Sequence, residues 1–104
     1  MKKTSIIPFP VQNAPRKLGT DIREARIKRR ITMALLAERA GITPVTLARV
    51  ERGEATVSIG IYAKVFFGMG LIRNLSNLID PDNDPVGKIY TTENLTKLVR
   101  HKKD

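Results

Sequence analysis

T-M-A-L-L-A-E-R-A-G-I-T-P-V-T-L-A-R-V-E-R-G, residues Thr32 to Gly53, is the stretch that decides the fold. It indicates two short helices joined by a tight turn. Gly41 can take the positive φ that a chain reversal requires, because it carries no Cβ. Thr43 is a good N-cap, and Pro44 loses nothing at the first helical position, where a backbone N–H has no intrahelical partner. The second helix is therefore expected to begin sharply at Pro44.

The small and apolar residues of this stretch recur at the spacing that two crossing helices need. Ala37 is small enough to lie where the helices cross, and the inner faces are expected to carry Leu36, Ala40, Leu47 and Val50. Two helices joined in this way form a helix-turn-helix, whose second helix normally lies in the major groove of DNA. The stretch therefore predicts a DNA-binding domain.

Length and composition limit what the rest of the chain can be. The 104 residues are 41% hydrophobic and 5% aromatic, with no Cys and no Trp, which favours one small all-α domain. Without Cys neither a disulfide nor a thiolate metal site can form, so we expect a cytoplasmic protein. The apolar run after Lys2 and Lys3 is short and broken by proline, so neither a signal peptide nor a membrane partner is expected.

The net charge of +9 indicates a polyanionic partner, and its distribution indicates which one. Residues 1–19 carry four Lys or Arg and no acid, residues 20–53 carry eight against four acids, and residues 80–104 are balanced at five each. The excess precedes or surrounds the helix-turn-helix and follows no helix with a large apolar exposed face. This favours double-stranded DNA over a membrane surface.

Three segments are expected along the chain. Residues 1–17 contain three prolines and should form a flexible N-terminal arm, either inert or in contact with the DNA. Residues 18–79 should form the DNA-binding domain, and residues 80–104 a C-terminal extension. The expected helices are 18–30 with Thr20 as N-cap, 33–40, 44–52, 58–69 with Ser58 as N-cap, and 71–79.

The C-terminal extension is expected to begin with a turn at Asp80 to Asp84. Lys88 to Tyr90 is expected to form a short strand, and Thr92 to cap a final helical turn; the lone His101 is assigned no chemistry. The Leu and Ile content of the expected helix 71–79 exceeds what the four preceding helices need, and Phe67 falls outside the core stripe of the helix before it. Part of this surface is therefore a candidate dimer contact, although simple core packing explains any single residue equally well. The dimer candidates on this surface are Phe67, Ile72, Leu75 and Ile79.

Over residues 18–79 the chain resembles the Cro/cI-type (XRE) DNA-binding domain. The resemblance rests on the motif itself, on the segment that precedes it, L-G-T-D-I-R-E-A-R at 18–26, and on the segment that closes it, V-E-R-G at 50–53. This resemblance implies an all-α, five-helix, lambda-repressor-like fold. It also implies that Arg49 makes a two-pronged contact to guanine and that Val45 or the Thr46 methyl meets a thymine methyl. The base-reading positions that it implies are Pro44, Val45, Thr46, Ala48 and Arg49.

The resemblance further implies contacts to the DNA backbone and one structural ion pair. Phosphates would be bound by backbone N–H groups at the starts of the second and third helices and by nearby basic side chains. Met33 departs from the family, which usually has a phosphate-binding Gln there, so the basic side chains would supply more of the attraction. The implied backbone contacts are Arg16, Lys17, Met33, Thr43 and Arg52, and the implied partly buried ion pair is Arg26 with Glu51.

A narrower resemblance rests on D-I-R-E-A-R-I-K-R-R at 21–30, V-S-I-G-I-Y-A-K-V-F-F-G-M-G-L at 57–71 and D-P-D-N-D-P-V-G-K at 80–88. These segments are similar to HipB-type antitoxins, which are encoded beside HipA-like Ser/Thr kinase toxins. The resemblance implies a homodimeric repressor of a type II toxin-antitoxin operon that binds operator DNA and a HipA-like kinase. It also implies that Ile89 and Tyr90 belong to a C-terminal segment that helps to form the dimer, which makes them further dimer candidates. The alternative is a stand-alone or phage-type repressor without a kinase partner.

An enzyme is disfavoured by what the sequence lacks. There are no paired carboxylates on a shared helix face, no cluster of metal ligands, no activated Ser and no glycine-rich loop that would hold a phosphate. We therefore expect no catalytic residues, no metal and no cofactor.

Overall fold

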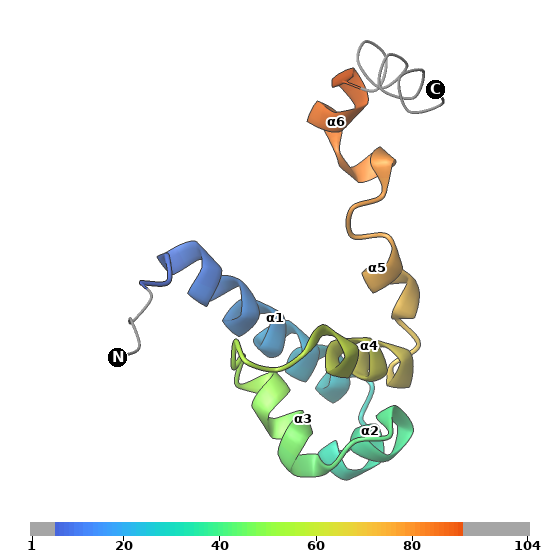
Figure 1. The fold of residues 1–104 in the computed structure, drawn as a ribbon. Helices are drawn as coiled ribbons and strands as arrows, with labels where there is room; N and C mark the ends of the chain where they lie inside the picture. The colour runs from blue at the N-terminus through green and yellow to red at the C-terminus, as the bar shows by residue number, and fades with distance from the viewer. Residues whose placement is uncertain (1–5, 91–104) are drawn as a thin grey trace, which may run out of the picture. The chain divides into compact units, whose positions relative to one another are not determined.

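The computed structural model describes residues 6–90, which are helical and contain no strand (Figure 1). The all-α fold is therefore confirmed. The chain divides into two compact units, residues 1–72 and residues 73–104. The elements are α1 Phe9–Lys28, α2 Met33–Ala40, α3 Pro44–Glu51, α4 Ile59–Gly68, α5 Ile72–Ser76, the 3-10 turn η1 Pro81–Asn83 and α6 Pro85–Tyr90.

The first helix is much longer than expected. α1 begins at Phe9, so the expectation of an extended arm is wrong for residues 9–17, and Thr20 lies inside the helix where an N-cap was expected. Pro10 lies in the first turn, where its missing N–H costs nothing, whereas Pro15 lies inside the helix and removes one backbone hydrogen bond. This part of α1 lies against the end of α3, where the main chain of Arg16 approaches Gly53. Residues 1–5 lie outside the described range.

Two glycines bring α1 and the end of α3 into main-chain contact. A Cβ on Gly19, in α1, would lie 2.5 Å from the carbonyl oxygen of Val50 and 2.6 Å from that of Glu51. A Cβ on Gly53, just after α3, would collide with the main chain of Arg16 in α1. Only glycine fits at either position, and this double contact fixes the position of α3 on α1.

The helix-turn-helix forms at the expected residues (Figure 1). Thr32 caps α2, and Thr43 caps α3 by accepting a hydrogen bond from the Thr46 N–H at 3.1 Å. Gly41 has φ of 72° and reverses the chain after α2, with the Ile42 N–H bonded to the Ala37 carbonyl at 3.0 Å. α3 ends at Glu51, one residue before the expected end.

The core of the first unit lies between α1, α2, α3 and α4. Leu36, Leu47, Val50 and Val65 are completely buried, and each contributes about 1.5–3 kcal/mol by leaving water. Ala37 is also buried, as the steep crossing of α2 and α3 requires. α4 begins after the expected cap, Ser58, whose hydroxyl accepts a hydrogen bond from the Ile61 N–H. The buried apolar residues are Ile22, Leu36, Ala37, Ala40, Leu47, Val50, Tyr62, Val65 and Met69.

The described part of the second unit, residues 73–90, buries none of its residues. The expected turn is present as η1, and α5 is shorter than expected. The strand expected at Lys88 to Tyr90 is wrong, because these residues end α6. The Asp84 carboxylate accepts a hydrogen bond from the Gly87 N–H at 3.0 Å and so caps this helix. A single strand would need a second strand to pair with, whereas the capped helix forms from local contacts alone. Thr92 and His101 lie outside the described residues.

Candidate nucleic-acid interface

A buried ion pair joins α1 to the last turn of α3. The Arg26 Nε donates to Glu51 Oε2 at 2.7 Å and the Arg26 Nη2 donates to Glu51 Oε1 at 3.2 Å, while Nη1 donates to the Ile31 carbonyl at 3.1 Å. The two side chains are 10% and 6% exposed. This pair is the one that the family resemblance implied, and it holds α3 from its inner side.

The outer face of α3 presents a mixture of apolar and basic side chains. Pro44 and Val45 are exposed, Val45 to 71%, whereas Thr46 and Ala48 are half-buried. The Thr46 hydroxyl accepts a hydrogen bond from the Thr43 hydroxyl at 3.0 Å, so both hydroxyls take part in the cap of the helix. The N-terminal end of α3 therefore presents the apolar side chain of Val45 to solvent.

Arg49, the expected guanine reader, belongs to a charged cluster that the sequence analysis did not foresee. Its Nε donates to Glu54 Oε1 at 2.8 Å and its Nη2 donates to the Thr56 hydroxyl at 3.2 Å. Arg52 donates to the other Glu54 oxygen, from Nε at 3.1 Å and from Nη2 at 2.7 Å. The hydrogen bonds from Arg49 and then Arg52 lower the pKa of Glu54 below its ordinary value, so the carboxylate is charged at neutral pH.

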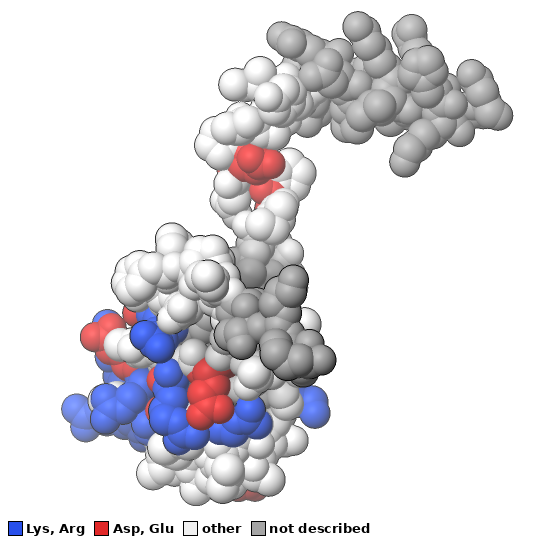
Figure 2. Space-filling model, turned by 60° about the vertical axis from the view of Figure 1, so that its left-hand side comes forward, with Lys and Arg blue, Asp and Glu red and all other residues white. Residues whose placement is uncertain are grey.

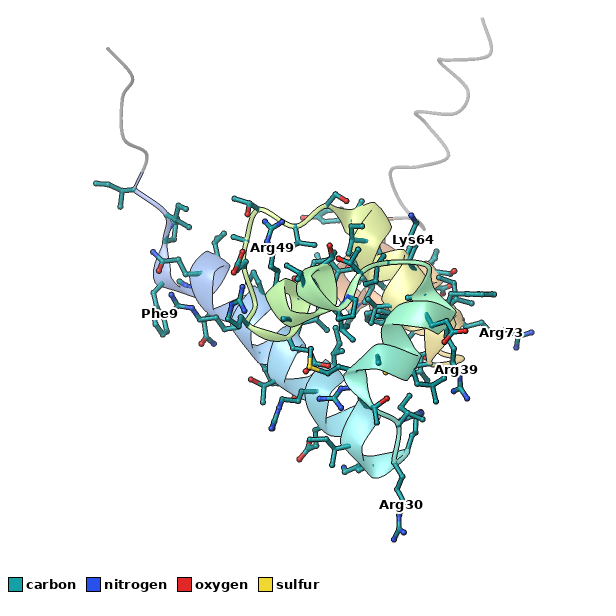
Figure 3. The ribbon with its side chains drawn as sticks, turned by 90° about the horizontal axis from the view of Figure 1, so that it is seen from below. Phe9, Arg30, Arg39, Arg49, Lys64 and Arg73 are labelled. Carbon is teal, nitrogen blue, oxygen red and sulfur yellow. The ribbon has the colours of Figure 1, made fainter. Side chains whose placement is uncertain are left out.

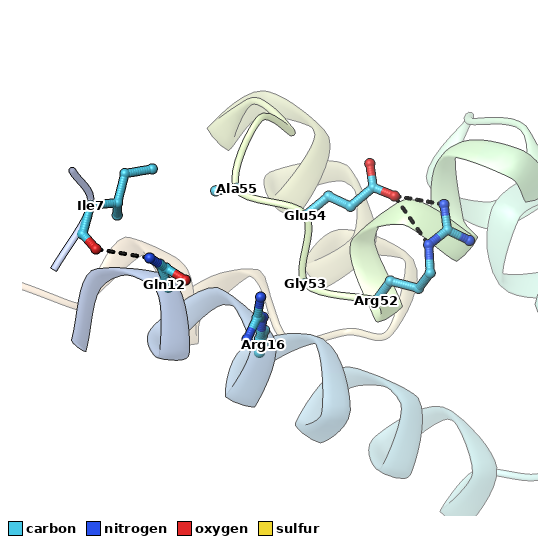
Figure 4. Close-up of a pocket in the computed structure, with 7 residues that line it drawn as sticks. All are labelled: Ile7, Gln12, Arg16, Arg52, Gly53, Glu54 and Ala55. Carbon is cyan, nitrogen blue, oxygen red and sulfur yellow. Dashed lines mark hydrogen bonds and ion pairs between the residues drawn. The ribbon is translucent and has the colours of Figure 1, made fainter. Parts of the chain in front are cut away.

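Arg16 reaches a surface hollow of about 400 Å³ between α1 and the loop after α3 (Figure 4). Its guanidinium has no hydrogen-bond partner within residues 6–90 and remains available to an anion. Lys17 instead pairs with Asp21 at 2.7 Å, and that hydrogen bond raises the pKa of Lys17. The hollow is lined by Ile7, Gln12, Arg16, Arg52, Gly53, Glu54 and Ala55.

Met33 was expected at the DNA backbone, but its side chain is half-buried and packs against the core. A methionine there contributes apolar burial in place of a polar contact.

Further basic side chains extend from the first unit. Arg30 and Arg39 are exposed and project into solvent (Figure 3), and Figure 2 shows Lys and Arg gathered across one face with Asp and Glu among them. Arg30 follows α1 with φ of 57°, a conformation that favours glycine, and its N–H bonds to the Ile27 carbonyl. Its place in a basic run gave no signal of this backbone geometry.

The six dimer candidates lie in both units. In the first unit Phe67 is 67% exposed and Ile72 36%. In the second unit Leu75 is half-buried, and the remaining three, Ile79, Ile89 and Tyr90, are exposed.

Within residues 6–90, no group of three or more His, Cys, Asp or Glu side chains is placed to hold a metal ion. No helix in this range is both long enough and apolar enough to cross a membrane.

Comparison with protein families gives a match in the first unit. The helix-turn-helix family model matches residues 22–65, from Ile22 in α1 to Val65 in α4, and this range contains the capped turn and the Arg26–Glu51 pair. No curated protein and no solved structure matches the chain. The matched family is one of DNA-binding regulatory domains, not of enzymes. Residues 22–65, less than half of the chain, therefore resemble a helix-turn-helix domain, in agreement with the capped α2, turn and α3 of the structure.

Proposed function

We propose that the protein is a sequence-specific transcriptional repressor that reads operator DNA with the outer face of α3. The observation that carries this proposal is the geometry of that helix. α3 begins at a sharp Thr43 cap, is held from its inner side by the Arg26–Glu51 pair, and presents Val45 and Arg49 outward. A rigid helix with an apolar contact and a forked donor fits a major-groove edge with a thymine methyl and a guanine.

The experiment is selection of duplexes from a randomised pool by the purified protein, followed by gel shift of a selected and a shuffled duplex at two salt concentrations. Binding should weaken steeply with salt, because phosphate contacts release counterions. Arg49→Ala should relax the base preference, whereas Arg16→Ala should weaken binding to both duplexes alike. Recovery of no preferred sequence, or binding that ignores salt, would contradict the proposal.

We further propose that the repressor acts as a homodimer in the cytoplasm. Two α3 helices one DNA turn apart, roughly 34 Å, would require a palindromic operator with matching half-sites. The exposed side chains of Phe67, Ile79, Ile89 and Tyr90 support an apolar contact between copies. Light scattering of wild type, Phe67→Ser and Ile89→Ser, which measures the molar mass in solution, tests this proposal. A wild type that is monomeric in solution and binds a palindromic duplex as one copy per duplex would contradict it.

The proposed partner protein is a HipA-like Ser/Thr kinase toxin, for which this chain would be the antitoxin. Support comes from the three segments, at 21–30, 57–71 and 80–88, that resemble HipB-type antitoxins. Coexpression with the product of the adjacent gene, and recovery of both in one complex, tests this proposal. A protein that binds its operator but recovers no kinase would be the stand-alone or phage-type repressor instead.

A further inference from the structure

Arg49 and Glu54 are joined twice, once through the backbone and once through the side chains. The Glu54 N–H donates to the Arg49 carbonyl at 3.2 Å, and the Arg49 Nε donates to Glu54 Oε1 at 2.8 Å. The turn that brings these residues together depends on Gly53, whose φ is 74° and which lies against the main chain of α1 at Arg16. The place of Glu54 beside Arg49 is therefore fixed by the packing of α1 on α3.

The Glu54 carboxylate is held from its other side as well. Its second oxygen accepts two hydrogen bonds from Arg52, at 3.1 and 2.7 Å, as Figure 4 shows. The Arg49 Nη2 is steadied by the Thr56 hydroxyl at 3.2 Å. The Arg49 guanidinium is thus fixed at Nε and at one hydrogen of Nη2, while Nη1 has no partner within residues 6–90.

We propose that Glu54 is a positioning residue for base reading, which fixes the Arg49 guanidinium so that its two terminal nitrogens face the DNA. Guanine accepts two hydrogen bonds, at O6 and N7, and Arg49 can supply them from Nη1 and from the second hydrogen of Nη2. The Nε–H then stays on Glu54. Because the side chain is already ordered, binding loses less side-chain entropy.

The charge of Glu54 acts in the same direction. A carboxylate between two guanidiniums weakens their attraction for phosphates, which is the part of the affinity that does not depend on sequence. Glu54 should therefore raise the ratio of specific to non-specific affinity in two ways, by strengthening the guanine contact and by weakening the contacts to the DNA backbone. This inference rests on the proposed function, because it requires that α3 reads bases.

The test uses the full chain and two probes, the duplex that wild type selects from a randomised pool and a shuffled duplex of the same length. The variants are Glu54→Ala and Glu54→Gln, with Glu24→Gln as a matched control. Glu24 is an exposed acid on α1 that approaches Lys28 at 4.0 Å, so its substitution removes the same charge without touching Arg49. Thermal unfolding followed by circular dichroism checks that each variant is folded.

Glu54→Ala should lower the ratio of the two affinities about five- to tenfold, the size expected for ordering one long side chain. Glu54→Gln, which keeps an acceptor for Nε, should lower it less, and Glu24→Gln should leave it unchanged. In an Arg49→Ala background Glu54→Ala should have no further effect on guanine preference. An unchanged ratio of specific to non-specific affinity in Glu54→Ala would overturn the inference. A raised ratio would also overturn it, because it would show that Glu54 keeps Arg49 from the base. A wild type that selects no sequence would instead refute the proposed function.

Discussion

Replacing Gly53 by alanine should destabilise the first unit far more than the same replacement at Gly41. Both residues have positive φ, 74° and 72°, so the backbone strain that a Cβ adds is nearly equal at the two positions. Their surroundings differ. A Cβ at Gly41 would meet nothing within 4 Å, whereas one at Gly53 would lie 2.7 Å from the Pro15 carbonyl oxygen and closer still to the main chain of Arg16.

The magnitudes follow from these two terms. Gly41→Ala carries the left-handed backbone term alone, about 1 kcal/mol. Gly53→Ala adds a collision with helix main chain, which cannot rotate away as a side chain can, and overpacking of this kind costs typically about 1–3 kcal/mol more. The expected loss of unfolding free energy at Gly53 is therefore about 2–4 kcal/mol.

Urea unfolding followed by circular dichroism measures both variants against wild type. Equal losses at Gly53 and Gly41 would show that α1 does not lie on the end of α3, and would refute the reasoning. Loss of protection from hydrogen exchange confined to residues 9–15 in Gly53→Ala would support it, because relief of the collision requires the first turns of α1 to leave α3.

Three further predictions concern charged residues. Arg26→Met should lower the unfolding free energy by about 3–5 kcal/mol, because it leaves Glu51 buried without a partner, and adding Glu51→Leu should recover most of that loss. If denaturant unfolding shows that the loss in the double variant equals the sum of the losses in the two single variants, the prediction is contradicted. Arg30→Gly should stabilise by about 0.5–1 kcal/mol, because φ at this position is 57°, and a lower melting temperature would disprove it. The folded-state pKa of Glu54 lies below its ordinary value of 4.5, so the contribution of the carboxylate to stability should be complete above pH 4.5 and lost as the pH falls through the folded-state pKa. Glu54→Gln and wild type should then have the same unfolding free energy in acid. A difference between their unfolding free energies that persists in acid would count against the ion pairs of Glu54.

The sequence alone predicts the helix-turn-helix closely, because its determinants are local. Thr43 and Pro44 start α3 and Gly41 reverses the chain through interactions within a few residues. The Ser58 cap of α4 is local in the same way. The Arg26–Glu51 pair, by contrast, joins residues far apart in the sequence and was accessible only through resemblance to a family.

The features that the sequence did not predict depend on tertiary contact. The prolines of residues 1–17 favoured an extended arm, yet α1 begins at Phe9 and runs through Pro15, and Gly19 and Gly53 allow it to pack on the end of α3. In the same way nothing in the spacing of Arg49 and Glu54 shows that they are paired, since a turn between them has to place them together. Arg49 was predicted as the base reader from the family resemblance, and its contacts with Glu54 and Thr56 are visible only in the structure.

The central claim is that Arg49 reads a base from α3, and the most direct measurement is the affinity of wild type and Arg49→Ala for the selected duplex and for its single-base-pair variants. Replacing one G·C pair should weaken wild-type binding about tenfold to a hundredfold, and Arg49→Ala should lose discrimination at that pair alone. Discrimination by Arg49→Ala that equals wild type at every pair would contradict it.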